Sequence, residues 1–221
     1  MNKMSVLIMS CDAYEDTWEP FFKLYTKYFP NEYKTYICTE TKECKHANTI
    51  KATGSWTKRL RKALEQIDTE LVLFMLDDFF IHGPVNKARI DEAISLFDIH
   101  SNTAVFNFEK KHRENEIIRW PYLWERQYKR QFYLNSCQPS IHNRSKLIER
   151  LQQDQNPWEW ELTIFDSPYD FYINSGDLII DIGYYAFNPF GIVRGKWSQE
   201  TKELFDREGI KVDYEKRGFI N

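Results

Sequence analysis

The sequence has few cysteines and no long apolar run. Its four cysteines, in 221 residues, form neither a CxxC pair nor a Cys/His spacing typical of a metal site. A chain of this length can bury a sizeable core without disulfides, so we expect a reduced, cytoplasmic protein. The apolar runs at residues 6–9 and 71–76 are too short for a secretory signal or for the roughly 20 residues of a membrane helix. We therefore expect no membrane-spanning segment.

Long blocks of like charge, internal repeats and linkers are also missing. Lys and Arg number 30 against 33 Asp and Glu, a net charge of −3, so the bulk charge does not indicate a nucleic-acid partner. The short basic segment at residues 110–113 is typical of a solvated face, with contact to an anionic or lipid-phosphate acceptor as the functional alternative. Because no Gly/Ser-rich linker divides the chain, we expect one continuous domain over residues 1–221.

Apolar runs alternate with segments of helical periodicity in the first half of the chain. Residues 71–76 are six apolar residues without alternation, typical of a central parallel strand buried on both faces. Ser55 has the position of a helix N-cap before apolar residues at helical spacing. The alternation predicts an α/β fold with a mostly parallel central sheet and helices on both faces. The expected strands lie at residues 5–10, 33–38, 71–76 and 104–108, and the expected helices at 18–29, 56–67 and 90–99.

The second half of the chain is less regular. Helices are expected at residues 144–153, from residue 156 and at 199–208, the last ending at Gly209, and a strand is expected at 178–182. Residues 110–130 are dense in charged and aromatic side chains and are expected to hold irregular structure or antiparallel strands.

Two adjacent carboxylates, Asp77 and Asp78, directly follow the apolar run at residues 71–76. In open α/β sheets, ligands bind beyond the carboxyl ends of the strands. Adjacent carboxylates repel unless one is solvated or both face a cation, and Mg²⁺ is commonly held by one or two carboxylates plus substrate phosphate. The pair therefore indicates a divalent metal site. The alternative is a solvated turn in which one Asp caps the next element.

Several short motifs together resemble bacterial glycosyltransferases of the GT-A fold, enzymes that build capsular or lipopolysaccharide chains. The resemblance extends over most of the chain and depends on the segments Cys11–Tyr14, Trp18–Phe22, Ser55–Leu60, Leu76–Phe80, Asn156–Glu161 and Gly191–Trp197. It implies a GT-A-like (Rossmann-like) fold, with a nucleotide-sugar-binding half at about residues 1–108 and an acceptor-binding half at about residues 109–221.

The resemblance also implies a ligand set. A nucleotide-diphosphate sugar would bind with Mg²⁺ or Mn²⁺, with Asp78 as the first metal ligand and Asp77 as a second ligand or as a contact to ribose or sugar. The commoner family pattern is Asp-x-Asp, and Phe79 stands in its third place here. The other nucleotide-sugar contacts would come from the loop after the first strand, a nearby helix, and a Gly-flanked loop whose cations cover the diphosphate. These residues are Asp12, Tyr14, Arg59, Arg194 and Lys196.

An inverting transfer needs a general base that takes the proton of the acceptor hydroxyl. Asn156 as N-cap and Glu159 at the third helical position form a capping-box pattern, which gives Glu159 a structural role. Glu161 has no such explanation, and the flanking indoles would raise its pKa by desolvation. We predict Glu161 as the base and Glu159 as the second choice, with Asp166 and Asp170 as substitutes.

The expected function is transfer of a sugar to a glycan or lipid-linked acceptor in surface polysaccharide biosynthesis. A lipid-linked acceptor would bring the protein to the inner membrane face. A sugar-phosphate nucleotidyltransferase is the nearest enzymatic alternative, but it should carry a Gly-rich basic loop after the first strand, where residues 10–14 hold no glycine. A noncatalytic carbohydrate-binding protein is the other alternative, because aromatic residues make up 16% of the chain and suit stacking on sugar rings.

Overall fold

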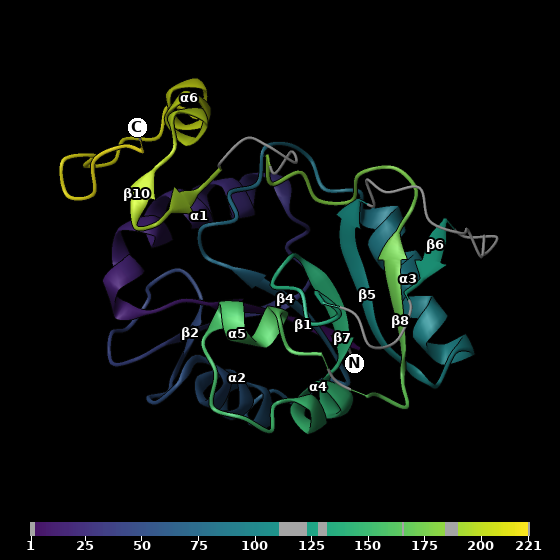
Figure 1. The fold of residues 1–221 in the computed structure, drawn as a ribbon. Coiled ribbons are helices and arrows are strands. Elements are labelled where there is room, and N and C mark those ends of the chain that lie inside the picture. Colours follow the sequence, from purple (N-terminus) through teal and green to yellow (C-terminus); the bar gives the residue numbers. More distant parts are fainter. Residues whose placement is uncertain (1–2, 111–122, 128–131, 165, 184–189, 221) are drawn as a thin grey trace.

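A mixed eight-stranded sheet lies at the centre of the computed structural model, which describes residues 3–110, 123–127, 132–164, 166–183 and 190–220 (Figure 1). The strand order is β3-β2-β1-β4-β7-β5-β8-β6. Neighbours from β3 to β4 are parallel, as are β5 and β8, whereas β7 is antiparallel to β4 and β5, and β6 is antiparallel to β8. All strands except β6 and β7 therefore share one direction. The strands are β1 (Met4–Met9), β2 (Lys34–Thr39), β3 (Asn48–Lys51), β4 (Leu71–Leu76), β5 (Thr103–Lys110), β6 (Trp124–Arg126), β7 (Ser140–Asn143) and β8 (Asp170–Asn174).

Helices cover both faces of the sheet, because alternate side chains of its central strands are apolar on both sides. Val6 and Ile8 of β1 belong to a first core with α1, α3 and α6, whereas Leu7 and Met9 belong to a second core with α2, α4 and α5. The predicted fold class, α/β with a mostly parallel sheet between two helical layers, is confirmed. The helices are α1 (Glu15–Tyr28), α2 (Trp56–Glu65), α3 (Lys87–Ile99), α4 (Arg144–Arg150), α5 (Pro157–Glu161) and α6 (Gln199–Glu208).

Most elements predicted for the first half are confirmed, with ends that differ by a few residues. β4 covers Leu71–Leu76, as predicted, and the Ser55 hydroxyl caps α2 by accepting a hydrogen bond from the backbone N–H of Lys58 (3.3 Å). β3 was not predicted. Only Ile50 of its four side chains is buried, so this edge strand has no apolar run that sequence periodicity could detect.

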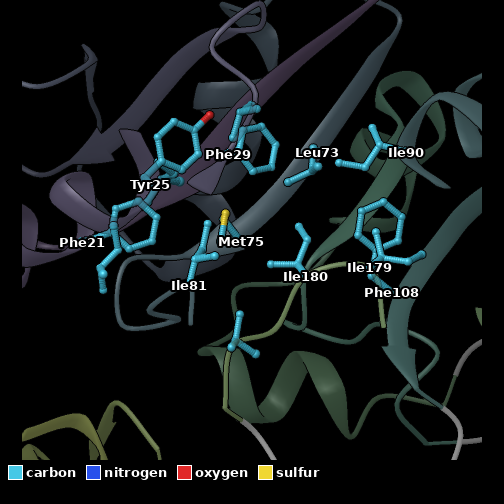
Figure 2. Packing of buried hydrophobic residues seen from close by; sticks show 14 of the residues in the cluster. Phe21, Tyr25, Phe29, Leu73, Met75, Ile81, Ile90, Phe108, Ile179 and Ile180 are labelled. Atoms are coloured by element: carbon cyan, nitrogen blue, oxygen red, sulfur yellow. The ribbon is translucent and has the colours of Figure 1, made fainter. Parts of the chain in front are cut away.

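The strand predicted at residues 178–182 is wrong. Ile179 and Ile180 are buried in the first core (Figure 2), but this segment pairs with no strand among the described residues. Instead, the Ile179 carbonyl accepts a hydrogen bond from the backbone N–H of Asn86 (2.9 Å), and the Asp181 carbonyl accepts one from His82 (2.8 Å). The apolar run therefore packs on the loop between β4 and α3 and does not enter the sheet.

The helices predicted in the second half are confirmed. α6 covers residues 199–208, with the Ser198 hydroxyl accepting from the backbone N–H of Thr201 (3.1 Å) and Gly209 in the left-handed conformation (φ 65°). No helix within the described ranges is long and apolar enough to cross a bilayer. Residues 111–113 of the basic segment lie outside the described residues.

The chain changes its direction across the sheet between β1 and β4. β2 and β3 extend to one side of β1, whereas β4 and all later strands of the sheet lie on the other side. The loops that leave the carboxyl ends of β1 and β4 therefore run in opposite directions along the sheet. In open α/β sheets, ligands bind in the crevice between two such loops. The residues after β1 and the acidic pair after β4 both lie there.

Candidate active site

Asp77 is anchored at the carboxyl end of β4 by groups from β1 and α1. Its side chain is buried, and its Oδ2 accepts hydrogen bonds from the hydroxyl of Ser10 and from Oγ1 of Thr17 (2.9 Å). The indole of Trp18 in turn donates to Oγ of Ser10 (2.6 Å). These contacts hold the Asp77 carboxylate in one orientation beside Asp78.

Asp78 lacks such partners. Its Oδ1 is buried, and no described residue donates a hydrogen bond to it. Burial raises the pKa of both carboxyl groups, and the charge of Asp78 raises the pKa of Asp77 further. A buried carboxylate oxygen without a donor is costly, and a cation would relieve that cost.

The acidic pair offers two carboxylates, the kind of ligand that binds Mg²⁺ or Mn²⁺. Carboxylate oxygens are hard ligands, and Mg²⁺ typically takes one or two of them together with phosphate oxygens and water. No group of three or more His, Cys, Asp or Glu side chains in the described part of the chain is arranged to hold a metal. Two carboxylates alone would fit Mg²⁺ or Mn²⁺ only if phosphate and water supplied the remaining ligands.

Arg217 brings a positive charge to this edge from the far end of the chain. Its Nε and Nη2 donate to the two carboxylate oxygens of Asp16 (2.6 Å each), and Nη2 also donates to the carbonyl of Ala13 (2.9 Å). The guanidinium lies 4.3 Å from the centroid of the Tyr14 ring, and its charge lowers the pKa of Asp78 against the larger effect of burial. Sequence analysis missed Arg217, because no pattern links residues that are 201 positions apart.

Tyr14 contacts Arg217 and lies near the acidic pair. Burial and the charge of Asp78 raise the pKa of Tyr14 to about 12, while Arg217 acts in the opposite direction. The phenol is therefore neutral at pH 7, and its hydroxyl is available as a hydrogen-bond donor. The predicted contact of Tyr14 with the nucleotide stays a prediction.

Arg194 and Lys196 lie on a two-stranded hairpin formed by β9 (Ile192–Val193) and β10 (Lys196–Trp197). Both side chains are exposed, and neither has a hydrogen bond or ion pair to a described residue. The turn places Arg194 and Gly195 at positive φ (51° and 81°). The carbonyl of Gly195 accepts from Nη1 of Arg217 (3.5 Å), which ties the hairpin to the loop that carries Tyr14.

Gly191, directly before this hairpin, packs closely against the backbone of Asp78. Its φ is +74°, and a Cβ at this position would overlap the backbone carbonyl oxygen of Asp78. We expect Gly191→Ala to destabilise the protein by about 2 kcal/mol or more, since left-handed strain and a backbone clash add. Gly195→Ala is the matched control, because its φ is +81° but no atom lies near the added Cβ. Thermal unfolding should show a clearly larger loss for Gly191→Ala, and equal losses would contradict this close approach.

Asp12 and Arg59 hold loops together at the same edge. The Asp12 carboxylate accepts hydrogen bonds from the backbone N–H groups of Glu40, Thr41 and Lys42 (3.1–3.2 Å). The buried Arg59 donates to the carbonyls of Ser10 and Ala52, and its Nη1 lies 3.6 Å from Oε1 of Glu40. Both side chains thus support the loops beyond β1 and β2. Their direct contact with a nucleotide stays a prediction.

Replacing Asp12 with alanine should reduce stability in a pH-dependent way. Desolvation raises its pKa, but the hydrogen bonds from residues 40–42 together outweigh it and lower the pKa to about 2. This stabilisation is therefore fully present above the ordinary pKa of 3.8 and is lost as pH falls toward 2. We expect Asp12→Ala to cost about 1 to 2 kcal/mol at pH 7, because several charge-assisted hydrogen bonds disappear from a solvent-screened site. Urea unfolding at pH 7 and pH 2.5 checks this, and an equal loss at both pH values would refute it.

Glu161 lies at the carboxyl edge with a second carboxylate, Glu109. Oε1 of Glu161 accepts a hydrogen bond from the backbone N–H of Cys137 (2.7 Å), and burial raises the pKa of Glu161 despite this bond. Burial and the charge of Glu161 raise the pKa of Glu109, which follows the apolar part of β5. Burial also raises the pKa of the Cys137 thiol, with further contributions from Glu161 and Asp78. Glu161 therefore lies near Glu109, and both Glu161 and Asp78 lie near Cys137.

Glu109 was not predicted from the sequence, although it follows an apolar strand segment just as Asp77 does. Both carboxylates come at the end of an apolar strand of the central sheet. Asp170, one of the predicted substitutes, begins β8 and is paired with Arg126, so it lies at the opposite edge. Asp166 is exposed.

Glu159 has the structural role that its spacing predicts. Its Oε2 accepts from the backbone N–H of Asn156, and its own N–H donates to Oδ1 of Asn156 (2.9 Å each). This reciprocal capping box is confirmed. Of the two flanking indoles, Trp160 is buried against Trp56, whereas Trp158 is 72% exposed.

No protein-family model matches the sequence, and no curated protein matches it. The structure is similar to the bifunctional IspDF from Campylobacter jejuni, with 15% identity, a TM-score of 0.44 and coverage of 80% of this chain and 50% of that chain. It is also similar to S. aureus TarS 1-349, with 14% identity, a TM-score of 0.43 and coverage of 79% and 60%. A cytidylyltransferase from Leptospira borgpetersenii shows 10% identity, a TM-score of 0.45 and coverage of 73% and 68%.

TarS 1-349 also forms a complex with UDP. The chain spans half of the IspDF chain and 60% of the TarS 1-349 chain. These likenesses concern the fold alone. The sheet topology itself confirms the predicted α/β fold class with a mostly parallel central sheet.

Proposed function

We propose that the protein is a glycosyltransferase that moves a sugar from a nucleotide-diphosphate sugar to a glycan or lipid-linked acceptor. The observation that carries this proposal is the buried Oδ1 of Asp78, which has no donor among the described residues and lies beside the anchored Asp77. This pair lies where open α/β sheets bind ligands. A metal-bound diphosphate would satisfy both the unpaired oxygen and the repulsion between the two carboxylates.

In this proposal, Asp78 and Asp77 hold Mg²⁺ or Mn²⁺, which when bound supplies Lewis-acid stabilisation of the departing diphosphate. Arg217 and the exposed cations Arg194 and Lys196 add positive charge on the same side of the site. Tyr14 lines the nucleotide side of this edge. Asp12 and Arg59 contribute chiefly by fixing the loops at residues 10–14 and 40–42.

Glu161 is the proposed base. It takes the proton of the acceptor hydroxyl while that oxygen forms a bond to the anomeric carbon, and the bond from this carbon to the diphosphate oxygen breaks with inversion. The products are the glycoside, a protonated Glu161 and a nucleoside diphosphate. Burial raises the pKa of Glu161, the direction that makes a carboxylate a stronger base.

We also propose a division of labour along the chain, with donor contacts from about residues 1–108 and acceptor contacts from about residues 109–221. The segment from Gly191 to Arg217 returns to the donor side, where it contacts Asp78 and Asp16. The resemblance in the sequence favours a surface-polysaccharide acceptor, such as a capsule or lipopolysaccharide chain, at the inner membrane face.

A nucleotide panel tests the proposal. Thermal unfolding would be followed with UDP, GDP, CMP and dTDP and their sugars, each with Mn²⁺ or with EDTA. A ligand at 100 times its dissociation constant adds about 2.7 kcal/mol, or roughly 5 to 10 °C for a chain of this size. We expect such a shift for one nucleotide class, in the presence of Mn²⁺ only.

Two other outcomes would replace the proposal. Stabilisation by glycans but by no nucleotide would indicate a noncatalytic carbohydrate-binding protein. Release of pyrophosphate from a nucleoside triphosphate and a sugar phosphate would indicate a nucleotidyltransferase, whereas a glycosyltransferase releases a nucleoside diphosphate from a nucleotide sugar.

A further inference from the structure

A pocket lies beside the end of α4. Its volume is about 260 Å³, and it is lined by the segments on either side of α5 and by the segment that leads into β8. The lining includes Asn135, Arg150, Gln153, Gln155, Thr163 and Ser167. Amides and hydroxyls predominate among these side chains, and they are the partners that a ligand with many hydroxyl groups requires.

Arg150, the last residue of α4, places a positively charged guanidinium in the pocket lining. The hydrogen bonds and the ring contact of this guanidinium are all with neutral groups. Its Nη1 donates to Oδ1 of Asn135 (2.7 Å), and its Nη2 donates to Nδ1 of His142 (3.0 Å). Its Nε donates to the carbonyl of Lys146 (3.3 Å), and the guanidinium lies 5.2 Å from the centroid of the Phe171 ring. No carboxylate of the described residues forms an ion pair with Arg150.

The group behind the guanidinium is also neutral. Because Nδ1 of His142 accepts from Arg150, the ring carries its proton on Nε2, which lies 2.8 Å from the Ser140 hydroxyl. Burial lowers the pKa of His142 well below its ordinary value, and the charge of Arg150 lowers it further. The positive charge of Arg150 is therefore not balanced from the protein interior.

The guanidinium has donors left for a ligand. Burial lowers the pKa of Arg150 to about 9, so the group remains charged at neutral pH. Three of its five N–H groups donate within the protein, which leaves two. An anion at this place would bind to those two donors and balance a charge that is costly to bury alone.

Two carboxylates that line the pocket are engaged elsewhere. Glu149 accepts a hydrogen bond from the Tyr169 hydroxyl, and Asp166 also has a partner of its own. The hydrogen bond of Glu149 goes to Tyr169 and not to Arg150. Because Glu149 and Asp166 would repel an anion, a ligand's negative charge must bind directly at the guanidinium.

We propose that this pocket binds an acidic sugar unit, with a carboxylate or phosphate on the free N–H donors of Arg150 and the sugar hydroxyls on the surrounding amides and hydroxyls. The pocket is close to the proposed base, because Asn135 lines it and Cys137, two residues later, donates to Glu161. Two residues of chain span at most about 7 Å. If the proposed function holds, the acidic unit belongs to the acceptor, and its neighbouring hydroxyl reaches Glu161.

Calorimetric titration of the full chain, without nucleotide or metal, tests this site. The probes are glucuronate, glucose 6-phosphate, inorganic phosphate and glucose as the neutral match. We expect an acidic sugar to bind at least about tenfold more tightly than glucose, since charge-assisted hydrogen bonds are about twice as strong as neutral ones. Preference for glucuronate or for glucose 6-phosphate would identify the anion as a carboxylate or a phosphate ester.

Variants locate the binding. Arg150→Gln should weaken acidic-sugar binding at least about tenfold, whereas Arg207→Gln, an exposed change on α6, should leave it unchanged. Gln153→Glu keeps Arg150 and its packing, and should weaken acidic sugars but not glucose, because it adds a negative charge to an exposed position of the lining.

No binding of either acidic sugar, or equal binding by the wild type, Arg150→Gln and Gln153→Glu, would overturn the proposal. Inorganic phosphate that binds as tightly as glucose 6-phosphate would overturn its sugar component. Because the titration needs no nucleotide, its failure leaves the donor-site test untouched, and failure of the donor-site test leaves this one untouched.

Discussion

Asp78→Asn should abolish Mn²⁺-dependent nucleotide binding and sugar transfer. The amide keeps the size of the side chain but removes the charge and one metal-ligand oxygen at the buried Oδ1 position. We expect nucleotide affinity in Mn²⁺ to fall at least about 100-fold, because even the partners of metal ligands are worth 10- to 100-fold in metal affinity. Calorimetric titration with the nucleotide identified by thermal unfolding measures this change.

Stability separates this effect from unfolding. Removing one charge from these two neighbouring carboxylates relieves repulsion, so the melting temperature of Asp78→Asn without metal should not fall. Asp206→Asn, an exposed change on α6, is the control for charge alone. Wild-type affinity in a folded Asp78→Asn would remove Asp78 from the donor site.

Glu161→Gln should reduce turnover by about 100- to 10,000-fold, the usual contribution of a general base, while the affinity for the donor stays unchanged. Burial raises the pKa of Glu161 above its ordinary value of 4.5. The carboxylate is the active form, so the wild-type rate should fall as the pH drops through this raised pKa. The residual rate of Glu161→Gln should lack that pH dependence. Initial rates between pH 4.5 and pH 8, at saturating donor, measure both effects.

Glu159→Ala is the matched control on the same helix. It removes one half of the capping box and should cost about 0.5 to 2 kcal/mol of stability, with turnover at 25 °C unchanged. If Glu161→Gln kept wild-type turnover and Glu109→Gln lost it, the role of base would pass to Glu109. If Glu159→Ala alone lost turnover, the assignment of roles within this helix would be wrong.

The fold was predictable where one local pattern determines an element. β4 is buried on both faces and thus appears as an uninterrupted apolar run, and α6 has a cap at each end. β7 was missed because three of its four residues are polar, and Ser140 and His142 are buried only by tertiary contacts. Residues 178–182 gave the opposite error, a predicted strand that does not form. Their apolar side chains are buried because the segment packs on a loop, without pairing in a sheet.

The candidate site was predictable to the extent that its residues follow strands or helices with clear patterns. Asp77 and Asp78 come from one pattern and Glu161 from another, and the structure brings both to one edge. Arg217 and the partners of Asp12 depend on contacts between distant segments, which no periodicity encodes. Asp12 was predicted as a nucleotide contact, but the structure adds a structural role that the sequence alone did not reveal.

The central claim, a divalent metal bound jointly by the acidic pair and a diphosphate, is tested most directly by electron paramagnetic resonance of Mn²⁺. The free-ion signal would be followed while wild-type protein or Asp78→Asn is added, with and without the nucleoside diphosphate that stabilises the protein. We predict that the wild type with nucleotide removes one equivalent of Mn²⁺ from the free signal and that Asp78→Asn does not. Equal binding of Mn²⁺ by both proteins, or no binding by the wild type, would contradict the claim.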